Sequence, residues 1–267
     1  MAPPDDAARP LERGGGSIGT TVAEGLARIT LDRPPVNVLT TAMMSDLAAA
    51  LRRVAADDAV RVVRLDAAGK TFSAGVDVGD HLGDLLPSMM AALADLFVAF
   101  DGVPQPIVAV VQGAALGGGL EVVLGCDLVV ASEKAIFGQP EIKLGVFAPP
   151  ATVLLPRRIG VQAATAMLLT GESVSASEAR RLGLVNEVFA LEGFDAAVTA
   201  WVARLLALSG AALRHAKRAL RESSRMPVQE AHVHVHDIYM NDLMATEDAH
   251  EGLRSFVEKR SAVWKHR

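Results

Sequence analysis

The most constraining feature of this sequence is an apolar strand that runs through a glycine-rich loop into an apolar helix. Residues 107–111 are Ile-Val-Ala-Val-Val, a pattern typical of a strand buried on both faces. Segment 113–119 carries four glycines, which let a backbone approach a ligand closely. A helix start offers unpaired N–H groups at the positive end of its dipole. The arrangement predicts a site for an oxygen atom that is, or becomes, negatively charged.

One carboxylate accompanies this predicted site. Glu121 lies one turn inside the helix on the same face as Gly118, and a charge in so apolar a helix is unusual. The phosphate-binding pattern G-x-x-x-x-G-K-[ST] is absent from the sequence, and no G-x-G-x-x-G follows a first strand. Close packing of a helix against a strand would also explain the glycines, so by themselves they leave the function open.

Strand and helix patterns alternate along residues 60–140, which predicts an α/β fold with right-handed crossovers. Glu24-Gly25 predicts a hairpin turn, and Ser175-x-x-Glu178 and Gly183 predict the two ends of a helix. We predict an irregular tail at 1–17, a core domain at 18–195 and a helical region at 196–267. The predicted elements are helices at 40–56, 88–100, 193–208, 210–223, 227–243 and 247–260, and strands at 60–65, 107–111 and 127–130.

The composition excludes several classes of partner. A net charge of −5 argues against nucleic acid, whose phosphates require a basic surface. A single cysteine, Cys126, excludes an internal disulfide and a CxxC zinc motif. The apolar stretch 106–128 is interrupted by Glu121 and five glycines, so no membrane span is predicted. Residues 1–17 lack the apolar segment of a signal peptide. We therefore expect a cytoplasmic protein.

Two other constellations were weighed as sites. His232 and His236 are four residues apart, so a helix would place both on one face, but no Glu or Cys completes a metal motif and we predict no metal. Ser73, His81 and Asp77 have the residue types of a nucleophilic triad, yet no Gly-x-Ser-x-Gly turn surrounds the serine.

Several segments together resemble one family. Phe72-Ser73-Ala74-Gly75-Val76-Asp77 and Gly117-Gly118-Gly119-Leu120-Glu121 are similar to the two oxyanion-binding segments of the crotonase family, also called the enoyl-CoA hydratase/isomerase superfamily. The resemblance covers roughly residues 18–265 in the order of the family. The further matching segments are 29–34, 37–39, 137–141 and 251–260.

The resemblance implies a ββα spiral core with a C-terminal helical trimerisation region, and a homotrimer or a dimer of trimers. It implies an acyl-CoA substrate, with coenzyme A as part of that substrate and no separate cofactor. The backbone N–H groups of Val76 and Gly118 would hold the thioester oxygen. The residues implied to contact the substrate or its coenzyme A are Val36, Ser73, Ala74, Val76, Asp77, Val78, Gly117, Gly118, Phe147, Pro149 and Lys259.

Glu121 and Glu141 match the two glutamates of the family's hydratases. Hydration of a conjugated double bond needs one group to take a proton from water and another to protonate carbon 2. We assign the water to Glu121 and the protonation to Glu141, but the reverse is open because crowded carboxyl groups share their titration. The pair favours a hydratase. The alternatives are a double-bond isomerase, an acyl-CoA hydrolase and a non-catalytic acyl-CoA-binding protein.

The loop after Glu141 departs from the family. Common hydratases have Gly-x-x-Pro-Gly-x-Gly-Gly, whereas residues 145–152 are Gly-Val-Phe-Ala-Pro-Pro-Ala-Thr. Pro149 replaces the first glycine of that loop and has no N–H to donate. This predicts a reshaped acyl pocket beside Glu141. The Pro-Pro variant is similar to cyclohexa-1,5-diene-carbonyl-CoA hydratases, so a cyclic dienoyl-CoA is an alternative substrate.

Overall fold

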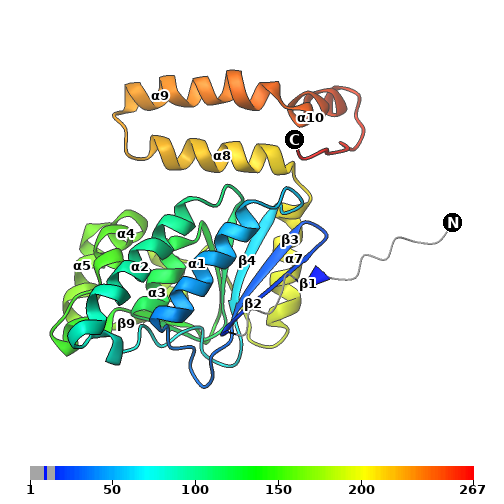
Figure 1. Cartoon of the computed structure of the whole chain (residues 1–267). Coiled ribbons are helices and arrows are strands. Elements are labelled where there is room, and N and C mark those ends of the chain that lie inside the picture. The colour runs from blue at the N-terminus through cyan, green and yellow to red at the C-terminus, as the bar shows by residue number, and fades with distance from the viewer. Residues whose placement is uncertain (1–8, 11–15) are drawn as a thin grey trace.

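A twisted, mostly parallel sheet forms the centre of the computed structural model in Figure 1, which describes Arg9, Pro10 and residues 16–267. Its strand order is β1-β2-β3-β4-β5-β7-β10, and a second sheet has the order β6-β8-β9. Antiparallel pairing is confined to β1–β2, β2–β3 and β8–β9 among the described strands. The strands are β1 (Arg9–Pro10), β2 (Ile18–Ala23), β3 (Leu26–Leu31), β4 (Val62–Ala67), β5 (Ile107–Val111), β6 (Ala114–Leu116), β7 (Leu128–Ser132), β8 (Ile136–Gly138), β9 (Ser173–Ser175) and β10 (Glu187–Phe189).

Helices cover the central sheet and extend beyond it (Figure 1). Short 3₁₀ turns lie at Gly79–His81, Gly83–Leu85, Pro140–Leu144 and Leu243–Ala245, and a π-helical turn lies at Ile238–Asp242. The α-helices are α1 (Thr41–Ala55), α2 (Leu86–Asp101), α3 (Gly118–Gly125), α4 (Pro149–Ile159), α5 (Val161–Thr170), α6 (Ala176–Leu182), α7 (Phe194–Leu206), α8 (Gly210–Ser223), α9 (Val228–Asp237) and α10 (Glu247–Val257).

Most of the predicted local signals are confirmed. Glu24 and Gly25 have φ angles of 49° and 82°, the conformation of a tight hairpin turn between β2 and β3. Ser175 Oγ accepts a hydrogen bond from the Glu178 N–H at the start of α6, and Gly183 ends that helix in the left-handed region. The helix predicted over 227–243 is confirmed in part. The α-helix ends at Asp237 and continues as a π turn, where Ile238 is buried and Asp242 pairs with Arg218 of α8.

The prediction that residues 107–111 are buried on both faces is also confirmed. Ile107, Ala109 and Val111 belong to the main core, which the sheet forms with α1, α2 and α3. Val108 and Val110 point to the other face, where they pack with residues of α7. Alternate side chains of this strand therefore pack into two different cores, and for that reason residues 107–111 are all apolar. Within the described residues, one helical stretch, Gly83–Asp101, has the length and hydropathy of a membrane span, and α2 within it packs against α1.

Somewhat less than the last quarter of the chain separates from this core after α7. Helices α8 and α9 form an antiparallel hairpin above the core, with α10 at its end (Figure 1). The predicted boundary between residues 195 and 196 lies inside α7, and it stays a prediction. Most of the predicted tail, residues 1–17, lies outside the described residues, although Arg9 and Pro10 pair with β2.

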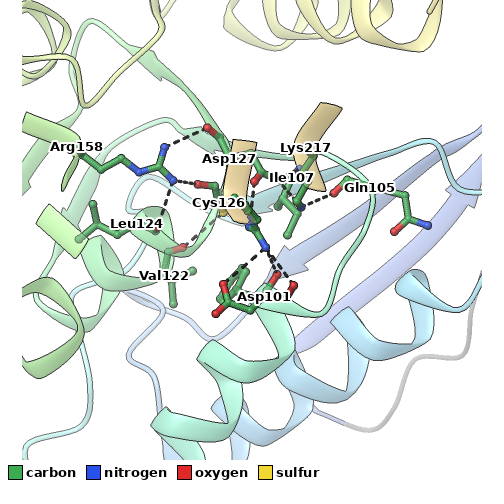
Figure 2. Close-up of polar contacts among 11 residues, drawn as sticks. Asp101, Gln105, Ile107, Val122, Leu124, Cys126, Asp127, Arg158 and Lys217 are labelled. Atoms are coloured by element: carbon green, nitrogen blue, oxygen red, sulfur yellow. Dashed lines mark hydrogen bonds and ion pairs between the residues drawn. The ribbon is translucent and has the colours of Figure 1, made fainter. Parts of the chain in front are cut away.

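A buried ionic cluster ties α8 to the core (Figure 2). Lys217 Nζ lies 2.6 Å from Asp127 Oδ2 and donates to the Gln105 carbonyl oxygen at 2.7 Å. Arg221 donates to the other Asp127 oxygen at 2.9 Å, and the Ile107 N–H donates to Asp127 as well. Burial lowers the pKa of Lys217 to about 8, although the carboxylate of Asp127 opposes that shift. Asp127 therefore compensates two cations at the joint between the core and the hairpin.

Removing the charge of Asp127 should destabilise the fold. We expect Asp127→Asn to lower the free energy of unfolding by about 3 kcal/mol, because it leaves the buried Lys217 cation without its counter-ion. Chemical denaturation measures this change. The control is Asp95→Asn, which breaks an ion pair with Arg52 in which both side chains are about half exposed, and which should change stability little. Equal effects of the two variants would contradict the role given to Asp127.

Candidate active site

The backbone N–H groups of two residues lie near one another at the start of α3. Segment 75–77 runs beside Leu39, which donates to the Gly75 carbonyl oxygen at 2.8 Å and accepts from the Asp77 N–H at 2.9 Å. This parallel pairing turns the N–H of Val76 away from Leu39. A Cβ atom placed on Gly118 would lie 3.2 Å from the Val76 nitrogen, so the two residues adjoin. Gly118 is the first residue of α3, and its N–H has no partner within the helix.

Glu121 lies in the same helix and is almost completely buried. Its side chain is 2% exposed, and Oε1 accepts the Ala151 N–H from the first turn of α4 at 3.0 Å. Burial raises the pKa of Glu121 to about 8, since an ionised carboxylate is poorly solvated there. The hydrogen bond from Ala151 opposes the shift, and the nearby charge of Glu141 adds to it.

Glu141 reaches the site from the 3₁₀ turn that follows β8. A Cβ atom on Gly117 would lie only 2.5 Å from Glu141 Oε1, so the carboxyl group lies directly against that glycine. Gly117 also has a φ of 54°, a positive value that glycine adopts readily because it has no Cβ atom. Burial raises the pKa of Glu141, while the charge of His81 opposes the shift. The structure therefore brings together the four residues predicted to be catalytic, Val76, Gly118, Glu121 and Glu141.

Gln139 is a residue that the sequence analysis missed. Its side chain is 1% exposed, and one end of its amide group lies 3.1 Å and 2.9 Å from the two carboxylate oxygens of Glu141, to which only the amide nitrogen can donate. Such contacts hold the carboxyl group in place and favour its ionised form. Gln139 lies in the matched segment 137–141, but nothing in its residue type shows that it would turn back towards Glu141.

The loops around the site hold several residues predicted to contact coenzyme A. Ser73 is fully buried, and its hydroxyl group donates to the Asn37 carbonyl oxygen and accepts from the Gly75 N–H. It therefore stabilises the loop, and its hydroxyl has no hydrogen bond to His81 or Asp77 among the described residues. Ala74 pairs with Val36 through a backbone hydrogen bond of 3.0 Å.

The remaining predicted contacts differ in exposure. Val78 is 57% exposed and Phe147 is 66% exposed, and Pro149 begins α4. Asp77 accepts the Gly79 N–H and so shapes its own loop. Lys259 follows α10, whose Asp248 accepts a hydrogen bond from the hydroxyl group of Ser209 just before α8. Its role towards coenzyme A stays a prediction.

Comparison with known proteins identifies the family. A sequence model described as Enoyl-CoA hydratase/isomerase matches residues 21–267. The chain belongs to this family. It is 41% identical to cyclohexa-1,5-dienecarbonyl-CoA hydratase of Thauera aromatica over 91% of this chain and 93% of that protein. It is 37% identical to a probable enoyl-CoA hydratase of Rhizobium meliloti, over 90% and 94% of the two chains.

Solved structures confirm the predicted crotonase-like fold. An enoyl-CoA hydratase of Geobacillus kaustophilus superposes with a TM-score of 0.92 at 28% identity, covering 98% of this chain and 100% of the other. An enoyl-CoA hydratase of Mycobacterium smegmatis has a TM-score of 0.88 at 34% identity, with coverage of 93% and 99%. The expected α/β core with its C-terminal helices is thus the fold of the family.

The burial of Glu121 makes stability depend on pH. Its pKa is about 8 in the folded chain and near 4.5 when solvated, so between these values the folded state holds a proton that the unfolded state has lost. Stability contributed by the protonated group is therefore lost as pH rises through this window. We expect the wild type to lose about 1 kcal/mol per pH unit relative to Glu121→Gln between pH 5.5 and 7.5.

Denaturation of both proteins at several pH values measures this difference. Glu141 is present in both proteins, so its own titration largely cancels from the comparison. A constant difference in stability across the window would show that Glu121 ionises as a solvated carboxyl group does.

Proposed function

We propose that the protein is an enoyl-CoA hydratase, which adds water across the conjugated double bond of a 2-enoyl-CoA thioester. The observation that carries the proposal is a pair of glutamates, the buried Glu121 and the half-buried Glu141, beside the adjoining backbone N–H groups of Val76 and Gly118. Coenzyme A enters as part of the substrate. The hydratases among the relatives support the same reaction.

The donors of Val76 and Gly118 suit the thioester oxygen. As water adds at carbon 3, electron density moves through the double bond to this oxygen, which becomes an enolate. Fixed N–H donors at the positive end of α3 stabilise that charge without reorganising, and the loss of one such donor typically slows a reaction by about 100-fold to 1,000-fold. Both groups belong to the backbone, so they are positioned by the glycines at the start of α3 and by the pairing of segment 75–77 with Leu39.

The two carboxyl groups complete the addition. One takes a proton from the water whose oxygen bonds to carbon 3, and the other delivers a proton to carbon 2 as the enolate collapses. The predicted division gives the water to Glu121 and the protonation to Glu141. The stronger burial of Glu121 favours the opposite division, because a raised pKa keeps that group protonated at neutral pH.

Turnover of an acyl-CoA panel tests the reaction. We expect loss of the conjugated absorbance and a product heavier by one water for crotonyl-CoA, a longer enoyl-CoA or a cyclic dienoyl-CoA. Glu121→Gln and Glu141→Gln should each lower kcat by about 100-fold to 10,000-fold while binding of a saturated acyl-CoA persists. A product of unchanged mass would indicate an isomerase, and release of free coenzyme A would indicate a hydrolase.

Exchange of the carbon 2 protons of butyryl-CoA in deuterated water separates the two roles. The glutamate that serves carbon 2 is required for this exchange, whereas the glutamate that serves the water is not. If Glu141→Gln abolishes exchange and Glu121→Gln retains it, the predicted division holds, and the opposite pattern reverses it.

We further propose that the protein is a homotrimer or a dimer of trimers. Support comes from apolar side chains on the C-terminal helices that the single chain leaves exposed, among them Val233 (73%), Phe256 (84%) and Val257 (79%). Sedimentation velocity should give three or six times the mass of the chain. Phe256→Ser should weaken this assembly, and Val161→Ser on α5, where the side chain is 71% exposed, is the control.

A further inference from the structure

Residues 264–267 lie as a strap across the end of the helical region. Trp264 Nε1 donates at 3.0 Å to the carbonyl oxygen of Ala207, which directly follows α7. A Cβ atom on Gly252 of α10 would lie 3.1 Å from the Trp264 ring, so the indole packs directly against that helix. This strap, defined as residues 264–267, therefore links α7 to α10 through one side chain.

A buried carboxylate holds the backbone of the strap. Asp248 of α10 is 2% exposed, and it accepts the N–H groups of Lys265 at 2.6 Å and of His266 at 3.0 Å. The hydroxyl group of Ser209, just before α8, donates to the same carboxylate at 2.5 Å. Hydrogen bonds to a charged acceptor are stronger than neutral ones, so Asp248 fixes the strap at the junction of α8 and α10.

The side chain of His266 can keep its place only as a neutral imidazole. The N–H of Gly210, the first residue of α8, donates to His266 Nδ1 at 3.1 Å. A backbone N–H cannot accept a hydrogen bond, so Nδ1 carries no proton and the neutral ring holds its proton on Nε2. A proton added to Nδ1 would turn this acceptor into a second donor and break the hydrogen bond with Gly210.

Positive charge faces this ring from two further elements. Arg61, just before β4, places Nη1 3.4 Å from His266 Nε2, and Arg214 of α8 donates to the backbone carbonyl oxygen of His266 at 2.6 Å. The start of α8 adds the positive end of a helix dipole. Burial and the charge of Arg61 lower the pKa of His266, the charge of Arg214 adds to this shift, and the charge of Asp248 opposes it. Protonation of the ring is therefore disfavoured while the strap is closed.

The backbone of His266 adds strain to the closed strap. Its φ of 63° lies in the left-handed region, which residues with a Cβ atom rarely adopt. Hydrogen bonds with Asp248, Arg214 and Gly210 hold this conformation. A protonated ring removes the bond with Gly210 and adds a repelled charge, and the backbone strain then favours release.

We propose that the strap is a pH-sensitive closure, held shut at neutral pH and released when His266 takes up a proton. In the released strap the ring is in water and binds a proton more readily than in the closed strap, so acid favours the released form. The stability that the neutral ring gives to the closed strap is fully present above the ordinary histidine pKa of 6.5 and is lost as pH falls below it. Release separates α10 from the end of α7 and the start of α8.

The fluorescence of Trp264 measures this release. The chain has two tryptophans, so Trp201→Phe leaves Trp264 as the single emitter. In this parent protein we expect the emission maximum to move to longer wavelength between pH 7 and pH 5, because the indole leaves Gly252 for water. The ratio of released to closed strap should rise by up to about tenfold for each unit of pH, the limit for the uptake of one proton.

Two variants of the parent identify the titrating group. His266→Asn keeps an acceptor oxygen near the position of Nδ1 and tolerates a positive φ, but it does not titrate, so its strap should stay closed across this pH range. His250→Asn, at an exposed position of α10, is the matched control and should retain the shift. A shift that persists unchanged in His266→Asn overturns the proposal, as does an emission maximum of the parent that is constant with pH.

Amide hydrogen exchange of the unsubstituted chain gives an independent measurement. We expect the protection of the Lys265 and His266 N–H groups, taken relative to an unfolded peptide at the same pH, to fall by about tenfold from pH 7 to pH 5.5, while the amides of β5 stay protected. Unchanged protection in the strap overturns the proposal. An equal loss of protection in β5 also overturns it, because the whole fold then opens.

Discussion

The close approach of segment 73–76 to the start of α3 is the contact on which the candidate site depends. The segment pairs with Leu39 on one side and with residues 114–116 on the other, so its backbone is held along both edges. A Cβ atom on Gly119 would lie 2.6 Å from the Ser73 carbonyl oxygen, so larger residues would force the segments apart. The backbone nitrogens of Val76 and Gly118 would then no longer adjoin.

This close packing also explains the acid–base properties of the site. It leaves Glu121 buried on α3, where ionisation is unfavourable. Ala151 is the first residue of α4 that can donate an N–H to that carboxyl group, because the two residues before it are prolines and have no N–H. The same turn of α4 therefore limits the hydrogen bonds to Glu121.

Much of the fold and of the site could be predicted because their signals are local. Residues 107–111 and 210–223 form the predicted strand and helix with their predicted bounds, since apolar periodicity and capping residues act within a few positions. The π turn after Asp237 could not be predicted, because it accompanies a pairing between Asp242 and Arg218, which belong to different helices. Gln139 was missed for a similar reason, since its contact with Glu141 depends on a turn between β8 and α4.

The sequence by itself determined the order of the elements, the two glycine-bearing segments and the two glutamates, because backbone freedom and apolar patterning are encoded residue by residue. The tertiary structure decided the environment of those residues. It places Val76 beside Gly118, and it buries Glu121, which raises the pKa of that group to about 8. It also brings Lys217 of α8 against Asp127 of the core. Burial and charge proximity arise only when distant segments pack together, so composition and spacing do not reveal them.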